Sequence, residues 1–121
     1  MFKIDIHDIT QKNTFFRKVL HTGEKAQLVV MNIQKGGEVG QEVHVGTDQI
    51  LVLIEGKAKA VINGEEKDFS LHELLFVPAG AAHNIINLGE SDLKLYTIYA
   101  PPEHLDGTIH KTQEEALHEH R

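Results

Sequence analysis

The sequence contains no cysteine, which excludes disulfide bonds and thiolate ligands, so any bound metal must be held by nitrogen and oxygen atoms. It has only two arginines, Arg17 and Arg121, so the residue best suited to clamp phosphate is scarce and a phosphorylated substrate is disfavoured, although lysines could serve. No basic run is present, and 18 acidic residues outnumber 12 basic ones for a net charge of −6. This balance argues against nucleic acid or an anionic membrane as a partner.

Long apolar runs are also missing. No stretch approaches the roughly 18 uninterrupted apolar residues of a membrane-spanning helix, and the N-terminal Met-Phe-Lys-Ile-Asp-Ile-His-Asp places acids where a signal peptide needs an apolar run. We therefore expect a cytoplasmic protein. The 121 residues fit one domain, and 40% apolar residues suffice for a packed core.

What the sequence does contain is a series of short apolar and β-branched runs broken by turns, the pattern of an all-β sandwich, jelly roll or barrel. Asn63-Gly64 is the strongest hairpin signal. Helix is expected to be nearly absent before the C-terminal end. The predicted strands are 15–20, 27–33, 42–45, 49–55, 57–62, 65–69, 74–77, 83–88 and 93–99.

The two prolines Pro101-Pro102 mark the point where we expect the barrel to give way to a tail. The predicted organisation is one barrel domain over residues 1–100 and a tail over residues 101–121. Thr112 and Glu115 have the spacing of a capping box, which predicts a short helix in the tail, a frayed end being the alternative.

Four polar residues attract attention as metal ligands. Glu42 and His44 lie two apart in a predicted strand, so both leave one face. Gln49 opens the next strand and could approach the same space, and His83 follows the tight turn 78–80. Each is a weak signal alone, because a lone strand histidine is more often a surface or hydrogen-bonded residue than a ligand.

Other histidines lie near turns or termini. We expect His7, His21, His104 and His110 to be surface residues.

Together these residues resemble the two motifs of the cupin family, G-x5-H-x-H-x(3,4)-E-x6-G and G-x(5,7)-P-x-G-x2-H-x3-N. The resemblance implies a double-stranded β-helix, or jelly-roll barrel, holding one divalent ion of iron, manganese, zinc, nickel or copper. Seven positions agree in spacing: Gly36, His44, Gly56, Pro78, Gly80, His83 and Asn87.

Three positions depart from the motifs: Glu42 replaces a histidine, Gln49 replaces the glutamate, and His72 replaces a glycine. The resemblance then implies the ligand set Glu42, His44, Gln49 and His83. This set keeps one carboxylate, but the carboxylate stands at position 42 instead of position 49. Two imidazoles and one carboxylate also hold non-haem iron(II) in other proteins. The alternative is a barrel that has lost its metal and keeps these residues as a hydrogen-bonded network.

The resemblance implies two functions between which the sequence does not choose, since one fold hosts unrelated chemistries. The first is a metal-dependent enzyme, an isomerase or a dioxygenase, acting on a small molecule in the barrel. The second is a non-catalytic barrel that binds a sugar or another small molecule. Small cupins commonly pair, so a homodimer is expected, with Phe15-Phe16 either at that interface or in the core.

Overall fold

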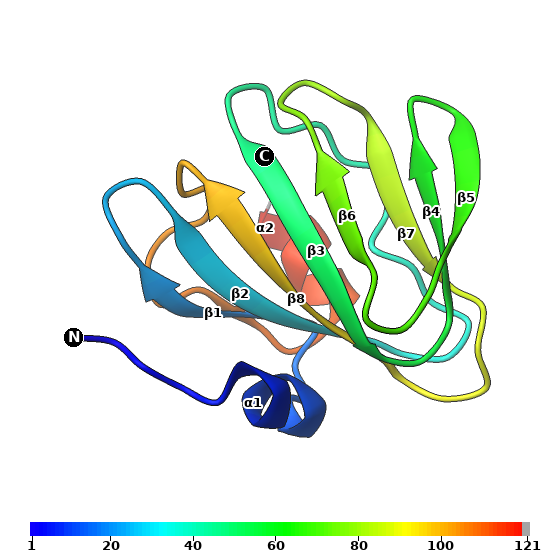
Figure 1. Ribbon diagram of the computed structural model, residues 1–121, viewed down its shortest axis with the longest axis horizontal. Coiled ribbons are helices and arrows are strands. Elements are labelled where there is room, and N and C mark those ends of the chain that lie inside the picture. Colours follow the sequence, from blue (N-terminus) through cyan, green and yellow to red (C-terminus); the bar gives the residue numbers. More distant parts are fainter. Residues whose placement is uncertain (120–121) are drawn as a thin grey trace.

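The structure is a computed structural model that describes residues 1–119. Two antiparallel sheets face each other, one of six strands in the order β6-β3-β8-β2-β1-β9 and one of three in the order β5-β4-β7 (Figure 1). This architecture confirms the predicted all-β jelly-roll fold. The elements are α1 Ile6–Lys12, β1 Arg17–Thr22, β2 Gln27–Ile33, β3 Asp48–Glu55, β4 Ala58–Ile62, β5 Glu65–Phe69, β6 Leu74–Val77, β7 His83–Asn87, β8 Leu93–Ala100, β9 Ile109–His110 and α2 Gln113–Glu119.

The core lies between the two sheets because apolar residues occupy alternate positions of the longest strands. Leu51 and Leu53 of β3 and Leu93 and Leu95 of β8 are at most 1% exposed. Full burial of such a side chain contributes about 1.5–3 kcal/mol. The same alternation turns Gln49, at the start of β3, toward the interior.

The turns explain several motif positions. Asn63 and Gly64 both have positive φ and join β4 to β5 as a hairpin. Gly56 has φ of 102°, and a Cβ there would meet the Leu93 backbone at 3.1 Å, so the position requires glycine. His72 keeps the positive φ of the motif glycine that it replaces, at 68°.

The expectation of almost no helix before the tail is wrong, because α1 forms near the N-terminus and contacts β8, β3 and β2. Its signals are local: the Asp5 side chain caps it by accepting from the Asp8 N–H at 3.0 Å, and Lys12 pairs with Asp8 one turn later at 3.1 Å. Within the described residues, neither helix has the length and apolar character needed to cross a membrane.

The predicted tail helix is confirmed as α2. Thr112 Oγ1 accepts from the Glu115 N–H at 3.2 Å, and Glu115 Oε1 accepts from the Lys111 N–H at 2.9 Å. Just before this helix, β9 pairs with β1, so the tail extends the larger sheet.

The predicted strand 42–45 is wrong, since it contains only one isolated bridge, between Glu42 and His83. The two residues exchange both backbone hydrogen bonds at 2.9 Å, and regular pairing goes no further. The expected alternation of faces nevertheless holds: His44 is buried while Val43 and Val45 are exposed.

Candidate metal centre

The bridge between Glu42 and His83 brings together two chain segments that are 41 positions apart in the sequence. Directly opposed residues of an antiparallel pair leave the same face, so both side chains enter the barrel. His44 joins them from two positions further along. One ligand atom from each of the three residues lies within 4.8 Å of the others.

His44 is held between two carboxylates and is 5% exposed. Its Nε2 lies 3.4 Å from Glu42 Oε1, and its Nδ1 lies 3.2 Å from Glu103 Oε2. A carboxylate on the far ring nitrogen is the usual device that orients a metal-binding imidazole. Glu103 can therefore fix the ring of His44 with Nε2 facing Glu42.

His83, 3% exposed, is oriented by the backbone. Its Nδ1 lies 3.1 Å from the carbonyl oxygen of Ala81, which can only accept a hydrogen bond, so Nδ1 carries the proton. Its Nε2 then has a free lone pair, and no hydrogen-bond partner reaches it from residues 1–119.

Gln49 lies on the inner face of β3 and is 3% exposed. Its Nε2 donates to Thr97 Oγ1 at 3.0 Å, while its Oε1 has no partner in the described part of the chain. The buried oxygen suits a weak ligand or a hydrogen-bond acceptor beside the cluster. Its membership of the ligand set stays a prediction.

Glu42 is ionised in this setting. Burial alone would raise its pKa, but the adjacent His44 ring and the charge of Arg17 outweigh burial and lower the pKa of Glu42 to about 2. Arg17 Nη2 lies 3.2 Å from Glu42 Oε2.

The pKa values of His44 and His83 are shifted in opposite directions. Burial would lower the pKa of His44, but the carboxylates of Glu42 and Glu103 raise it above its usual value. Burial lowers the pKa of His83, and the charge of His44 acts in the same sense. His83 is therefore the more firmly neutral imidazole, as a ligand must be.

Several residues of the site were not foreseen. Arg17, 1% exposed, reaches Glu42 from β1, and Tyr99 stacks edge-on against both His44 and His104. The surface prediction holds for His7 and His21, which are exposed, but is wrong for His110, which is 3% exposed because β9 packs it beside β1, and His104 is half-buried.

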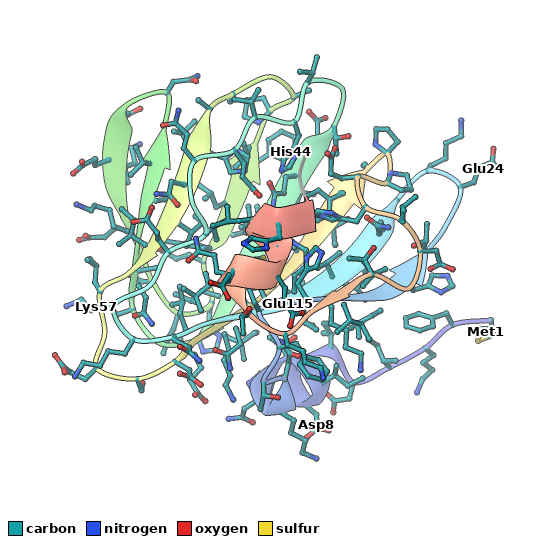
Figure 2. All side chains as sticks on the ribbon, turned by 180° about the vertical axis from the view of Figure 1, so that it is seen from behind. Met1, Asp8, Glu24, His44, Lys57 and Glu115 are labelled. Carbon is teal, nitrogen blue, oxygen red and sulfur yellow. The ribbon has the colours of Figure 1, made fainter. Side chains whose placement is uncertain are left out.

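A cavity of about 330 Å³ opens onto the cluster. Its lining includes Glu42, His44 and Glu103, and Leu117 of α2. Figure 2 shows α2 lying across the barrel with His44 beside one end of the helix. The tail therefore forms part of the mouth of the site.

The donor atoms fit a divalent ion. His44 Nε2, His83 Nε2 and Gln49 Oε1 are buried atoms with lone pairs, and none has a hydrogen-bond partner in residues 1–119. Two donors to one ion lie at most about 4 Å apart, so small side-chain shifts would bring the three grouped residues into bonding range. Nitrogen and carboxylate donors suit zinc, iron, manganese, nickel and copper.

Comparison with known proteins places the chain in a family. It is 38% identical to the uncharacterised protein YrkC of Bacillus subtilis over 96% of this chain and 66% of that protein, and 36% identical to the uncharacterised protein L612 of Acanthamoeba polyphaga mimivirus over 90% and 71%. The chain thus spans about two thirds of the length of YrkC.

Among solved structures, BH2720 of Bacillus halodurans superposes with a TM-score of 0.95 at 36% identity, covering 97% of this chain and 93% of that one. The family model described as a cupin domain matches residues 29–99, which include the two motifs and all four predicted ligands. The chain belongs to the cupin family.

Proposed function

We propose that this cupin binds one divalent metal ion through Glu42, His44 and His83, with Gln49 beside them, and is an enzyme that acts on a small molecule in the barrel. The observation that carries the proposal is the convergence of one ionised carboxylate and two imidazoles within 4.8 Å on the inner face. When bound, such an ion supplies polarisation of a ligand oxygen, for isomerase-type chemistry, or activation of dioxygen, for dioxygenase-type chemistry.

The protein's own residues prepare the site. Glu103 orients His44, the Ala81 carbonyl orients His83, and Arg17 holds the second oxygen of Glu42. Three protein ligands leave coordination positions open for a substrate. The cavity beside Glu42 and His44 gives a small molecule a way in.

Elemental analysis of untagged protein, dialysed against each candidate metal, tests the proposal beside the double variant Glu42→Ala, His83→Ala. We expect about one ion per chain in the wild type and none in the variant. Iron, copper or manganese would favour a dioxygenase, and zinc or nickel an isomerase. An empty wild type would refute the metal site.

The alternative, a non-catalytic barrel that binds a sugar or another small molecule, has one observation in its favour. Glu42 already pairs with Arg17, and His44 lies between two carboxylates, so part of the network is satisfied by protein groups alone. Chemical change of any ligand that binds would reject this alternative. Tight binding without turnover, with metal and oxygen present, would favour it.

We also propose a homodimer formed through the outer face of the larger sheet. Leu74 and Phe76 of β6 are 61% and 50% exposed on that face, beside the half-buried Ile50 of β3. Phe16, the alternative interface residue, is in the core. Light scattering should give twice the chain mass, and Phe76→Lys should give a monomer. A monomeric wild type at micromolar concentration would contradict the dimer.

The cytoplasmic location stays a prediction.

A further inference from the structure

The buried polar atoms without partners are of two chemical kinds, and a metal ion accounts for only one of them. His44 Nε2, His83 Nε2 and Gln49 Oε1 can offer lone pairs to a cation. Arg17 Nε, Arg17 Nη1 and Tyr99 Oη bear hydrogen, and apart from the contact between Arg17 and Tyr99 themselves no partner reaches them within the described chain. A cation cannot satisfy a hydrogen-bond donor, so these atoms require an acceptor of another kind.

Arg17 is the main member of this donor group. It is 1% exposed and makes one side-chain ion pair, from Nη2 to Glu42 Oε2 at 3.2 Å. A guanidinium carries five N–H donors, so most of its capacity is left over. Leaving such donors buried and unpaired is costly, so an additional partner is strongly favourable.

Tyr99 faces the same space. It is fully buried, and Arg17 is close enough that its charge counters the rise in the pKa of Tyr99 that burial causes. Its ring packs edge-on against His44 with 5.5 Å between centroids. The donors therefore lie directly beside the metal cluster.

The charges around the cluster also favour a ligand that carries a negative charge. Glu42 and Glu103 supply two negative charges around the cluster, and Arg17 supplies one positive charge. Leaving the histidines aside, a divalent ion would turn this deficit into an excess of one positive charge. A single anionic group on the ligand would neutralise the site.

We propose that Arg17, assisted by Tyr99, binds the carboxylate of the small molecule held in the barrel, so that the substrates of this cupin are small organic acids. The inference rests on the proposed function, because it takes the metal cluster as the place where the rest of the ligand reacts. A planar carboxylate has two acceptor oxygens, which match an arginine already anchored through one nitrogen.

Calorimetric titration with glycolate and its uncharged counterpart glycolamide tests this inference. Metal-loaded wild-type protein should bind glycolate at least about tenfold more tightly than glycolamide. Arg17→Gln, loaded to one ion per chain as checked by elemental analysis, should lose most of that preference, and Arg17→Lys should retain part of it. Lys18→Gln, which removes a positive charge from the adjacent, outward position of the same strand, should behave as wild type.

An Arg17 variant could fail to fold, so Tyr99→Phe provides a second test. It removes only a hydroxyl, whose side-chain contact is with Arg17. It should weaken glycolate binding severalfold while circular dichroism stays unchanged. Equal binding of glycolate and glycolamide, no binding of either, or full glycolate affinity in the Arg17 or Tyr99 variants would overturn the inference. If the wild type holds no metal, the proposed function fails, and glycolate binding that is lost in Arg17→Gln would still uphold the carboxylate site.

Discussion

The two ends of the barrel interior differ in chemistry although the same strands build both. Along β3 the inward position changes from Gln49 to Leu53, and along β7 it changes from His83 to Ile85. The inward positions of the antiparallel β8 change in the same way, because Tyr99 pairs with Gln49 and Leu95 pairs with Leu53. One end is therefore a packed apolar core and the other a polar site.

This division explains how the barrel tolerates buried polar atoms without partners. Such atoms are costly, and they persist only where other contacts determine the fold. The apolar end supplies those contacts through leucines that are at most 1% exposed. Changes at the two ends should consequently have separable effects, on ion binding at one end and on folding at the other.

The largest effect is expected at the polar end, from His83→Ala. Removing one imidazole from the three grouped ligands should weaken ion binding by more than about a hundredfold, because even residues behind the ligands contribute 10–100-fold. His7→Ala, which changes an exposed histidine of α1, is the control and should keep full ion content. Competition with a chelator measures both affinities, and equal affinities in the two variants would contradict a metal site at the polar end.

The next effect belongs to the apolar end. Leu53→Ala truncates a side chain with 0% exposure and should lower the free energy of unfolding by about 2–5 kcal/mol. Urea denaturation measures the loss. The folded variant should still bind one ion, and loss of the ion at full stability would contradict the separation of the two ends.

Gln49→Leu should have a smaller effect, since its amide is a weak ligand or an outer hydrogen-bond acceptor. We expect ion affinity to fall by about tenfold. The companion Gln49→Glu restores the carboxylate of the family motif and should raise the affinity above wild type. An unchanged affinity in both variants would exclude Gln49 from the site.

The smallest effect is a pH dependence confined to the polar end. The pKa of His83 is lowered and burial lowers that of His104 to about 3, so at these two residues the unfolded state binds more protons than the folded state as pH falls below about 6.5. The raised pKa of His44 acts in the opposite sense. Glu42 adds stability above about 4.5 that is lost as pH falls toward about 2. Chelator-treated protein should therefore be less stable to urea at pH 5 than at pH 7. Greater stability at pH 5 than at pH 7 would contradict this prediction.

Short-range patterns predict the fold, and the resemblance to the cupin motifs singled out Glu42, His44 and His83, which the structure brings together. Alternation placed Glu42 and His44 on one face, and the turn 78–80 set His83 at the start of a strand. The isolated bridge could not be foreseen, because pairing with a partner 41 positions away is decided by tertiary packing.

Arg17 and Glu103 were missed because they lie outside the motifs and reach the cluster only when β1 and the tail close around it. A signal for Arg17 was nevertheless present. It lies two positions before Val19, so in a strand it shares the inward face of that apolar residue. An arginine on a core face indicates a buried charge that needs partners.

The position at which an ion binds is the most direct test of the metal centre. Anomalous difference maps from crystals of untagged protein grown with Mn²⁺ would locate it. We predict one peak within bonding distance of Glu42, His44 and His83, with Arg17 still on the second oxygen of Glu42. No peak at this position in crystals that contain manganese elsewhere, with Glu42 bound to Arg17 alone, would contradict it.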